Sequence, residues 1–139
     1  MIERILVAYD DSREADRALK TTIDLCRALG ADLKVITVVE PVPSYLSFAP
    51  SARFAMNWQN EQQSRCSVLQ RHARQQMTRS GVYPDAELIP GDEVSTILEC
   101  AKKYRADLLI LGMGMHSLLS GDTGRRLAEQ APCSVLGVR

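Results

Sequence analysis

The chain has 139 residues, of which 45% are hydrophobic and 24% are charged, a composition that suits one globular domain with a sizeable core. Its 17 basic and 17 acidic side chains cancel, so the overall charge favours neither a nucleic acid nor an anionic membrane as a partner. Because no apolar run approaches the ~20 residues of a membrane span and no signal-peptide pattern begins the chain, we expect a single cytoplasmic domain over residues 1–139.

Five short apolar runs predict the strands of a parallel sheet. They cover residues 5–9, 33–39, 86–89, 108–111 and 134–138, and the third and fifth are the weakest. Continuous runs such as ILVA and LLIL are typical of strands that are covered on both faces, which is the usual situation in a parallel sheet.

Between these runs, apolar residues recur at helical spacing and predict four helices. The expected helices are one over 13–29 that ends at Gly30, one over 52–80 that ends at Gly81, one around 94–101, and a short one around 127–131 that ends at Pro132. The alternation predicts an α/β fold in which four helices flank a five-stranded parallel sheet through right-handed crossovers.

Ligands of such open sheets bind beyond the carboxyl ends of the strands, where the strand order reverses. Asp10 and Gly112 both end apolar runs, so both are expected at that crevice. The proline-containing connection over 40–55 reads either as a lid over the crevice or as a plain surface loop.

Two consecutive carboxylates, Asp10 and Asp11, follow the first strand and admit three roles. They could hold a divalent metal, as in a phospho-accepting receiver domain, receive the sugar or base of a nucleotide, or begin the next helix. A receiver domain also needs an acceptor carboxylate after its third strand and a late lysine. Since residues 41–60 contain no acid and residues 104–139 contain no lysine, the receiver hypothesis is disfavoured.

The two acids are expected to differ in their roles. Asp11 or Ser12 precedes the first helix, where a short oxygen-bearing side chain accepts a hydrogen bond from an unpaired backbone N–H. Asp10 ends the strand, where its carboxylate can turn into the crevice and accept hydrogen bonds from a ribose hydroxyl or an amino group. We therefore predict that Asp11 caps the helix and that Asp10 faces a ligand.

Several short segments in a fixed order resemble the universal stress protein family along essentially the whole chain. They are ILVAYDDS near the start, TVVEP closing the second strand, GV and then PGD before the third helix, ADLLILG, and the ending APCSVLGVR. The resemblance implies a five-stranded parallel sheet flanked by helices, Rossmann-like in architecture, and a homodimer formed through the last strand, Ser134 to Val138.

One branch of that family binds ATP through a signature G-x-x-G, nine further residues, and then G-S or G-T. By resemblance, Ala8, Tyr9 and Asp10 would line the base and ribose site, and Val38 would offer backbone atoms to adenine. Leu111 and Gly112 would begin the phosphate loop. Glycines let a backbone approach phosphate closely, and the helix that follows presents free N–H groups and a positive dipole end.

This chain departs from the signature in the loop itself. Counted back from the APCSV segment, Gly121 takes the place of the final glycine and Asp122 that of the hydroxyl residue. The loop from Gly112 to Gly121 is four residues shorter than the family spacing, and Gly114 only lies near the place of the second signature glycine.

Asp122 places a carboxylate where relatives have a hydroxyl that donates to phosphate. It can cap the helix itself, and it would repel a triphosphate by ~1 kcal/mol or more at an effective dielectric constant of about 20–80. Thr123, Arg125 and Arg126 could compensate, although arginines this early in a helix are usually solvated. The base half of the site therefore appears intact in the sequence and the phosphate half altered.

Two functions follow from this pattern. The first is a non-enzymatic stress-response dimer with a degenerate adenine-nucleotide site, since no catalytic constellation is present. The second is an ATP-binding switch or slow ATPase that uses the rearranged 112–123 loop, with ATP, ADP or AMP as ligand and Mg²⁺ accompanying a triphosphate.

The cysteines, histidines and aromatic residues that remain are expected to have structural roles or to lie at the surface, with one alternative for the aromatic residues. The four scattered cysteines, without a C-x-x-C pair, are expected to be reduced core thiols. His72 and His116 are expected at the surface. The aromatic residues Tyr45, Phe54 and Trp58 could form a lid or a partner surface, or could anchor the long helix to the sheet.

Overall fold

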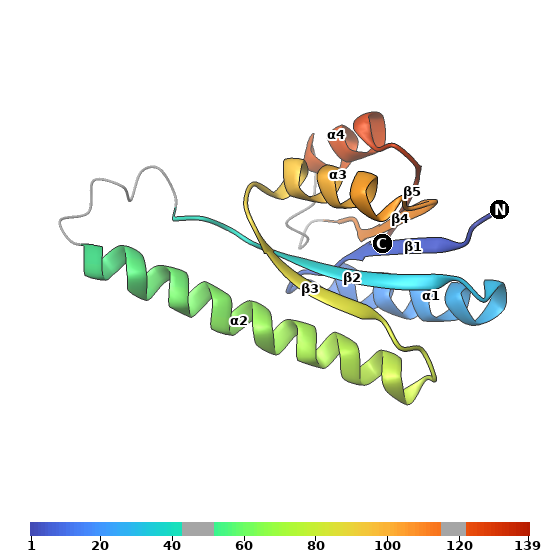
Figure 1. Ribbon diagram of the computed structural model, residues 1–139, viewed down its shortest axis with the longest axis horizontal. Coiled ribbons are helices and arrows are strands. Elements are labelled where there is room, and N and C mark those ends of the chain that lie inside the picture. The colour runs from blue at the N-terminus through green and yellow to red at the C-terminus, as the bar shows by residue number, and fades with distance from the viewer. Residues whose placement is uncertain (43–51, 115–121) are drawn as a thin grey trace.

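The computed structural model describes residues 1–42, 52–114 and 122–139, and shows five strands alternating with four helices (Figure 1). Tyr45, His116 and Gly121, for which the sequence made predictions, and most of the 40–55 connection lie outside the described residues. In chain order the elements are β1 (Arg4–Ala8), α1 (Arg13–Leu29), β2 (Asp32–Val39), α2 (Ala52–Arg79), β3 (Asp85–Pro90), α3 (Glu93–Tyr104), β4 (Leu108–Gly112), α4 (Asp122–Gln130) and β5 (Ser134–Val138).

The strands form one parallel sheet in the order β3-β2-β1-β4-β5. Strand β1 lies between β2 and β4, so the order reverses beside β1 and the carboxyl ends of these strands form the expected ligand-binding edge. The α/β fold with a five-stranded parallel sheet and four helices is thereby confirmed.

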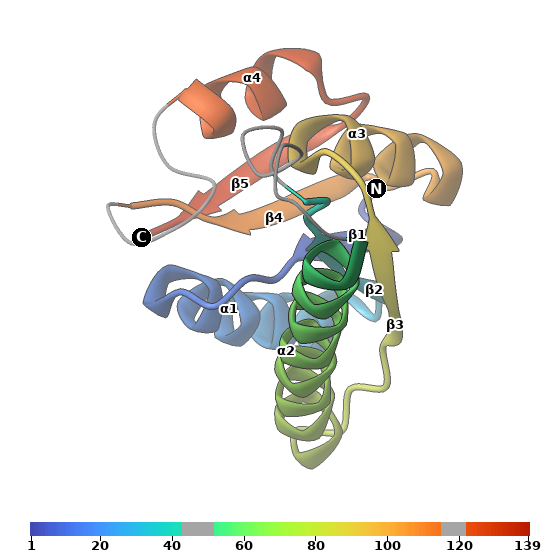
Figure 2. The same ribbon diagram turned by 90° about the vertical axis from the view of Figure 1, so that its left-hand side faces the viewer.

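The helices cover the two faces of the sheet in pairs (Figure 2). Helices α1 and α2 pack on one face, and α3 and α4 pack on the other. Strands β1 and β4 are therefore enclosed from both sides, which explains their continuous apolar sequence: residues 5–8 of β1 and all of β4 are buried. The edge strands β3 and β5 are only partly covered.

Local signals set several helix ends. Gly30 ends α1 in the left-handed conformation with φ of 65°, and its N–H donates to the Cys26 carbonyl, as the sequence predicted. Ser12, and not Asp11, caps the start of α1 by accepting a hydrogen bond from the Ala15 N–H. The prediction for Asp11 was wrong. Asp11 and Ser12 both have side chains that can cap a helix, and only the path of the chain decides which of them lies at the first turn of α1.

Helix α2 is longer than the sheet it packs on. Its Ala73 and Met77 are fully buried against the sheet, whereas its N-terminal part begins beyond the carboxyl end of β2 (Figure 1). Helix α4 begins at Asp122, five residues before the expected 127–131 segment, because its first turn is polar and carries no apolar periodicity.

The cysteines behave as core residues. Cys26, Cys66 and Cys100 are buried, Cys133 is partly buried, and all four are free thiols. His72 is exposed, as expected, and its ring contacts the Gln76 side-chain amide. Among the described helices, none combines the length and apolar character required to cross a membrane.

Candidate functional site

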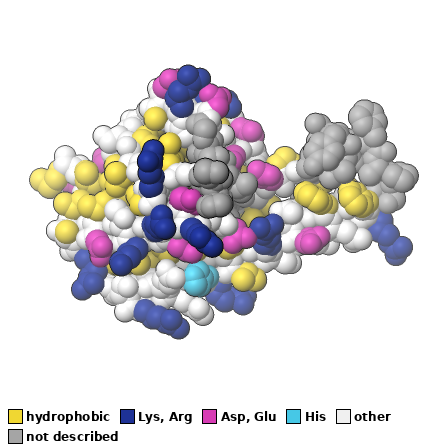
Figure 3. All heavy atoms as spheres, turned by 180° about the vertical axis from the view of Figure 1, so that it is seen from behind, with side chains coloured by type: hydrophobic (Ala, Val, Ile, Leu, Met, Phe, Trp, Pro, Cys, Tyr) yellow, Lys and Arg dark blue, Asp and Glu magenta, His cyan; other side chains and the backbone are white. Residues whose placement is uncertain are grey.

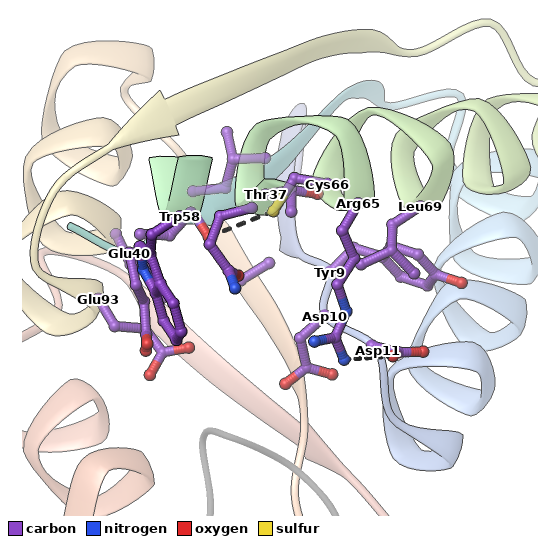
Figure 4. Close-up of a pocket in the computed structure, with 15 residues that line it drawn as sticks. Tyr9, Asp10, Asp11, Thr37, Glu40, Trp58, Arg65, Cys66, Leu69 and Glu93 are labelled. Carbon is purple, nitrogen blue, oxygen red and sulfur yellow. Dashed lines mark hydrogen bonds and ion pairs between the residues drawn. The ribbon is translucent and has the colours of Figure 1, made fainter. Parts of the chain in front are cut away.

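A cavity of about 250 Å³ opens at the carboxyl ends of β1 and β2 (Figure 4). Residues from the ends of both strands form its floor, and side chains of α2 and α3 form its walls. It lies where the strand order predicts a ligand site, and its size approaches the lower end of small-molecule sites, about 300 Å³.

Asp10 lines this cavity, and the residue is only 9% exposed. The Ser12 hydroxyl donates a hydrogen bond to this carboxylate and accepts one from the Ala15 N–H at 3.0 Å. Ser12 thus joins the helix cap to the site, because one hydroxyl both begins α1 and orients Asp10.

Replacing Ser12 by alanine is expected to lower the stability of the fold and to change the orientation of the Asp10 side chain. Ser12→Ala removes the α1 cap and leaves a buried carboxylate with one donor fewer, so the free energy of unfolding should fall by about 1–2 kcal/mol. Ser12→Thr keeps the hydroxyl and should lose much less. Urea unfolding of both variants measures the effect, and equal losses would contradict the assignment of the cap.

Asp11 pairs across the cavity mouth with Arg65 of α2, with 2.7 Å between its Oδ2 and the guanidinium. Both side chains are more than half exposed, so the pair contributes little to stability. The Asp11 carboxylate raises the pKa of Arg65 further above its usual range. The pair connects the β1–α1 turn to α2 at the rim of the cavity.

The floor of the cavity is formed by β2. Val38 lies there as expected, and its carbonyl oxygen is 4.0 Å from the Cys66 thiol. The neighbouring Thr37 is 3% exposed, and its hydroxyl has no hydrogen-bond partner among the described residues. A buried hydroxyl without a partner is uncommon and is available to a ligand.

Glu40, Glu93 and Trp58 occupy one end of the cavity (Figure 4). Burial, followed by the charges of Glu40, Asp10 and Asp92, raises the pKa of Glu93 to about 7. Sequence reasoning missed both glutamates. Glu40 directly follows β2 as Asp10 follows β1, so the same strand-end rule could have identified it, whereas Glu93 reaches the cavity only through the position of α3.

Tyr9 contributes to the cavity from the end of β1, but its ring belongs to the core. Its hydroxyl donates to Asp16 on α1 at 2.6 Å, and burial together with that carboxylate raises the pKa of the phenol. Ala8, Tyr9, Asp10 and Val38 therefore lie around one cavity, as the resemblance implied.

The residues expected at the phosphate end are placed differently. Of the described candidates, Leu111, Gly112, Gly114, Asp122 and Thr123 do not line this cavity. Leu111 is fully buried in the core. Gly112 lies so close to the start of α1 that a Cβ atom on it would be 2.5 Å from the Ala15 nitrogen. The end of β4 and the first turn of α1 are thus in direct backbone contact.

A second carboxylate, which sequence reasoning missed, lies beside Gly114. Glu14 of α1 is only 7% exposed, and its Oε2 has no hydrogen-bond partner among the described residues. A Cβ atom on Gly114 would be 2.7 Å from the other carboxylate oxygen of Glu14. The segment that follows β4 therefore begins against a buried acid in this chain.

Asp122 is the first residue of α4, and its carboxylate accepts a hydrogen bond from the Arg125 guanidinium at 2.8 Å. Arg125 is about 70% exposed, so it is solvated as expected, and it also pairs with the similarly exposed Asp122. The pair offsets part of the negative charge that Asp122 brings to this helix end.

Comparisons with known proteins agree with this architecture. The model of the universal stress protein family matches residues 1–139. A universal stress protein of Thermus aquaticus, described as lying in the QAH/OAS sulfhydrylase 3' region, is 33% identical over the whole of both chains.

Two solved structures show the same fold. The universal stress protein UspA from Lactobacillus plantarum has a TM-score of 0.84 at 22% identity and covers 99% of this chain and 98% of its own. The universal stress protein from Archaeoglobus fulgidus in complex with dAMP has a TM-score of 0.69 at 17% identity over the whole of both chains. The match of the family model to every residue, together with the 33% identical relative, shows that this chain belongs to the universal stress protein family.

Proposed function

We propose that this protein is a non-enzymatic stress-response module whose site binds the nucleoside end of an adenine nucleotide and prefers AMP to ATP. The observation that carries the proposal is the cavity around Asp10, which lies at the strand reversal and is enclosed by groups that can hydrogen-bond a nucleoside.

The donor and acceptor groups of the cavity support the proposal that it binds the nucleoside end of the nucleotide. The Asp10 carboxylate can accept hydrogen bonds from ribose hydroxyls, and the buried Thr37 hydroxyl lacks a partner among the described residues. The solved relative from Archaeoglobus fulgidus holds dAMP, an adenine nucleoside monophosphate.

The preference for few phosphates is supported by the fixed negative charges near the expected phosphate path. Glu14 is buried beside Gly114, and Asp122 occupies the first turn of α4. A charge of the same sign a few ångströms away weakens binding by ~1 kcal/mol or more at an effective dielectric constant of about 20–80. Each added phosphoryl group therefore meets repulsion in place of the hydroxyl donor that the family signature supplies.

Calorimetric titration of the purified protein with AMP, ADP and ATP tests the proposal. We expect the dissociation constant to increase from AMP to ATP, and AMP binding to weaken about tenfold or more in Asp10→Ala because a charged acceptor is lost. Glu129→Ala, at an exposed position of α4, is the control and should bind as the wild type does. Absence of AMP binding, or ATP as the tightest ligand, would overturn the proposal.

Replacing Asp122 by serine is expected to restore part of the phosphate site. Asp122→Ser removes a negative charge and returns a hydroxyl to the first turn of α4, so ATP affinity should rise about tenfold. AMP affinity should change by less than about threefold, because its single phosphoryl group lies closer to the nucleoside. The same titrations measure both, and an unchanged or weaker ATP affinity would contradict the repulsion argument.

The second candidate function is an ATP-binding switch or slow ATPase, and the Asp122–Arg125 pair favours it. The Arg125 guanidinium lies 2.8 Å from the Asp122 carboxylate and could neutralise it when a triphosphate enters. This function predicts phosphate release from ATP that disappears in Asp10→Ala. If the protein releases phosphate from ATP no faster than buffer alone does, the non-enzymatic proposal stands.

We further propose that the protein forms a homodimer through β5. This strand is one edge of the sheet, and its Val135, Leu136 and Val138 are only partly covered. Apolar edges of this kind favour pairing with a second copy around a two-fold axis. Light scattering should give twice the chain mass, and Leu136→Lys should reduce it to that of one chain.

A further inference from the structure

We propose that Trp58 is the residue against which the purine ring stacks, an assignment that rests on the proposed nucleotide-binding function. Trp58 is the single tryptophan of the chain. It lines the cavity from the first third of α2, and no feature of the family resemblance assigns it a role.

The position of Trp58 follows from the offset between α2 and the sheet. The partly buried Leu69 and the fully buried Ala73 and Met77 lie four positions apart and pack one face of α2 against the sheet. The same face continues toward the N-terminus through Cys66 and Gln62 to Trp58, at steps of four residues, and all three line the cavity. Because α2 begins beyond the carboxyl end of β2 (Figure 1), this end of the face covers the cavity.

The indole stands at one end of the cavity with Glu40 and Glu93 beside it, and Asp10 lies on the other side (Figure 4). Its Nε1–H is buried and has no acceptor among the described residues. A buried donor that lacks a partner is rare in proteins. This N–H lies in the plane of the indole ring, so it is available to an acceptor at the ring edge while a purine occupies the ring face.

The charges define which end of a nucleotide enters beside Trp58. Glu40 and Glu93 are acids next to the indole, so a phosphoryl group is disfavoured there, whereas an exocyclic amino group can donate to them. The adenine ring therefore lies at the Trp58 end and the ribose at Asp10. A purine also overlaps an indole over a larger area than a pyrimidine does, so stacking favours purine nucleotides.

The fluorescence of Trp58 tests the proposal directly, because the chain has no other tryptophan. The wild-type protein is titrated with AMP and, separately, with UMP, with excitation at the red edge of the indole band where neither base absorbs. We expect quenching by AMP that saturates with the dissociation constant measured by calorimetry, and little quenching by UMP at the same concentrations.

Two substitutions separate the ring from its N–H group. Trp58→Leu removes the aromatic face and should weaken AMP binding about fivefold or more, since stacking of a base on an aromatic side chain contributes at least that factor. Trp58→Phe keeps an aromatic face and should retain more of the affinity than Trp58→Leu. Met56→Leu, at an exposed position one half-turn away, is the matched control and should bind AMP as the wild type does.

The outcomes separate this inference from the function on which it rests. If calorimetry detects no AMP binding to the wild type, the proposed function fails. If AMP binds but the indole fluorescence does not change and Trp58→Leu keeps full affinity, the stacking assignment fails and the proposed function stands. The wild-type fluorescence titration remains decisive even if a Trp58 variant does not fold.

Discussion

Gly112→Ala is expected to lower the free energy of unfolding by about 3 kcal/mol, an effect at the upper end of the usual range for overpacking. The added Cβ atom would lie 2.5 Å from the Ala15 nitrogen and 2.5 Å from the Glu14 carbonyl carbon. Both are backbone atoms at the start of α1, which the Ser12 cap holds in place, so neither can move without displacing the helix. Urea denaturation followed by circular dichroism measures the loss.

Gly137→Ala is the matched control, because it also places a Cβ atom in contact with a neighbour. Here the neighbour is the Met113 thioether, and an unbranched methionine side chain can adopt another rotamer. The loss should be below about 1 kcal/mol. Equal losses for the two glycines would contradict the argument that contact with rigid backbone determines the cost.

Glu93→Gln is expected to raise the free energy of unfolding by about 1.5 kcal/mol at pH 8 and to leave it nearly unchanged at pH 4. The pKa of Glu93 is raised from 4.5 to about 7 in the folded protein, chiefly by burial and then by Glu40, Asp10 and Asp92. The folded state therefore holds this proton more tightly than the unfolded state, so ionisation destabilises the fold as the pH rises from about 4.5 to about 7. The predicted gain is less than half of what the full shift would give, because the side chain is only partly buried.

Glutamine resembles the protonated glutamate and does not ionise, so it removes this pH dependence. Thermal or urea unfolding at pH 4, 6 and 8 should give curves for the wild type and Glu93→Gln that converge at the acid end and diverge at the alkaline end. Glu129→Gln, exposed on α4, controls for the removal of one negative charge from the surface. A gain of the same size at pH 4 and pH 8 would rule out titration of Glu93 as its cause.

The fold could be predicted from the sequence because its strongest signals are local. Enclosed strands require apolar side chains on both faces, and ILVA in β1 and LLIL in β4 show this directly. Gly30 marked the end of α1 because few other residues adopt its left-handed conformation readily. Asp10 could be placed at the crevice because it follows the end of β1, and residues that follow a parallel strand lie at the carboxyl edge of the sheet.

The sequence could not decide which of several adjacent candidates takes a role. Asp11 and Ser12 are both good capping residues, and the direction of the chain after β1 selected Ser12. Apolar periodicity marked only the second half of α4, because its first turn has no apolar face. The start near Asp122 was indicated only by the family resemblance, which placed Asp122 at a helix N-terminus.

What the sequence by itself determined was the order of the elements, the parallel sheet, the family and the position of Asp10. Only the tertiary structure brought Trp58, Glu40 and Glu93 to one end of the cavity, and only it placed the Glu14 carboxylate against Gly114. The physical reason is that periodicity and helix-end signals depend on a few neighbouring residues of the chain. These contacts depend instead on how far α2 extends past the sheet and on how closely α1 approaches β4.

On the face shown in Figure 3, Lys and Arg side chains lie among Asp and Glu side chains. This distribution agrees with the balance of 17 basic and 17 acidic residues, which can be counted directly in the sequence. The acidic end of the cavity is a local departure from that balance. It exists because folding gathers carboxylates from β2 and α3 that lie far apart in the chain, and no count of charges along the sequence can reveal it.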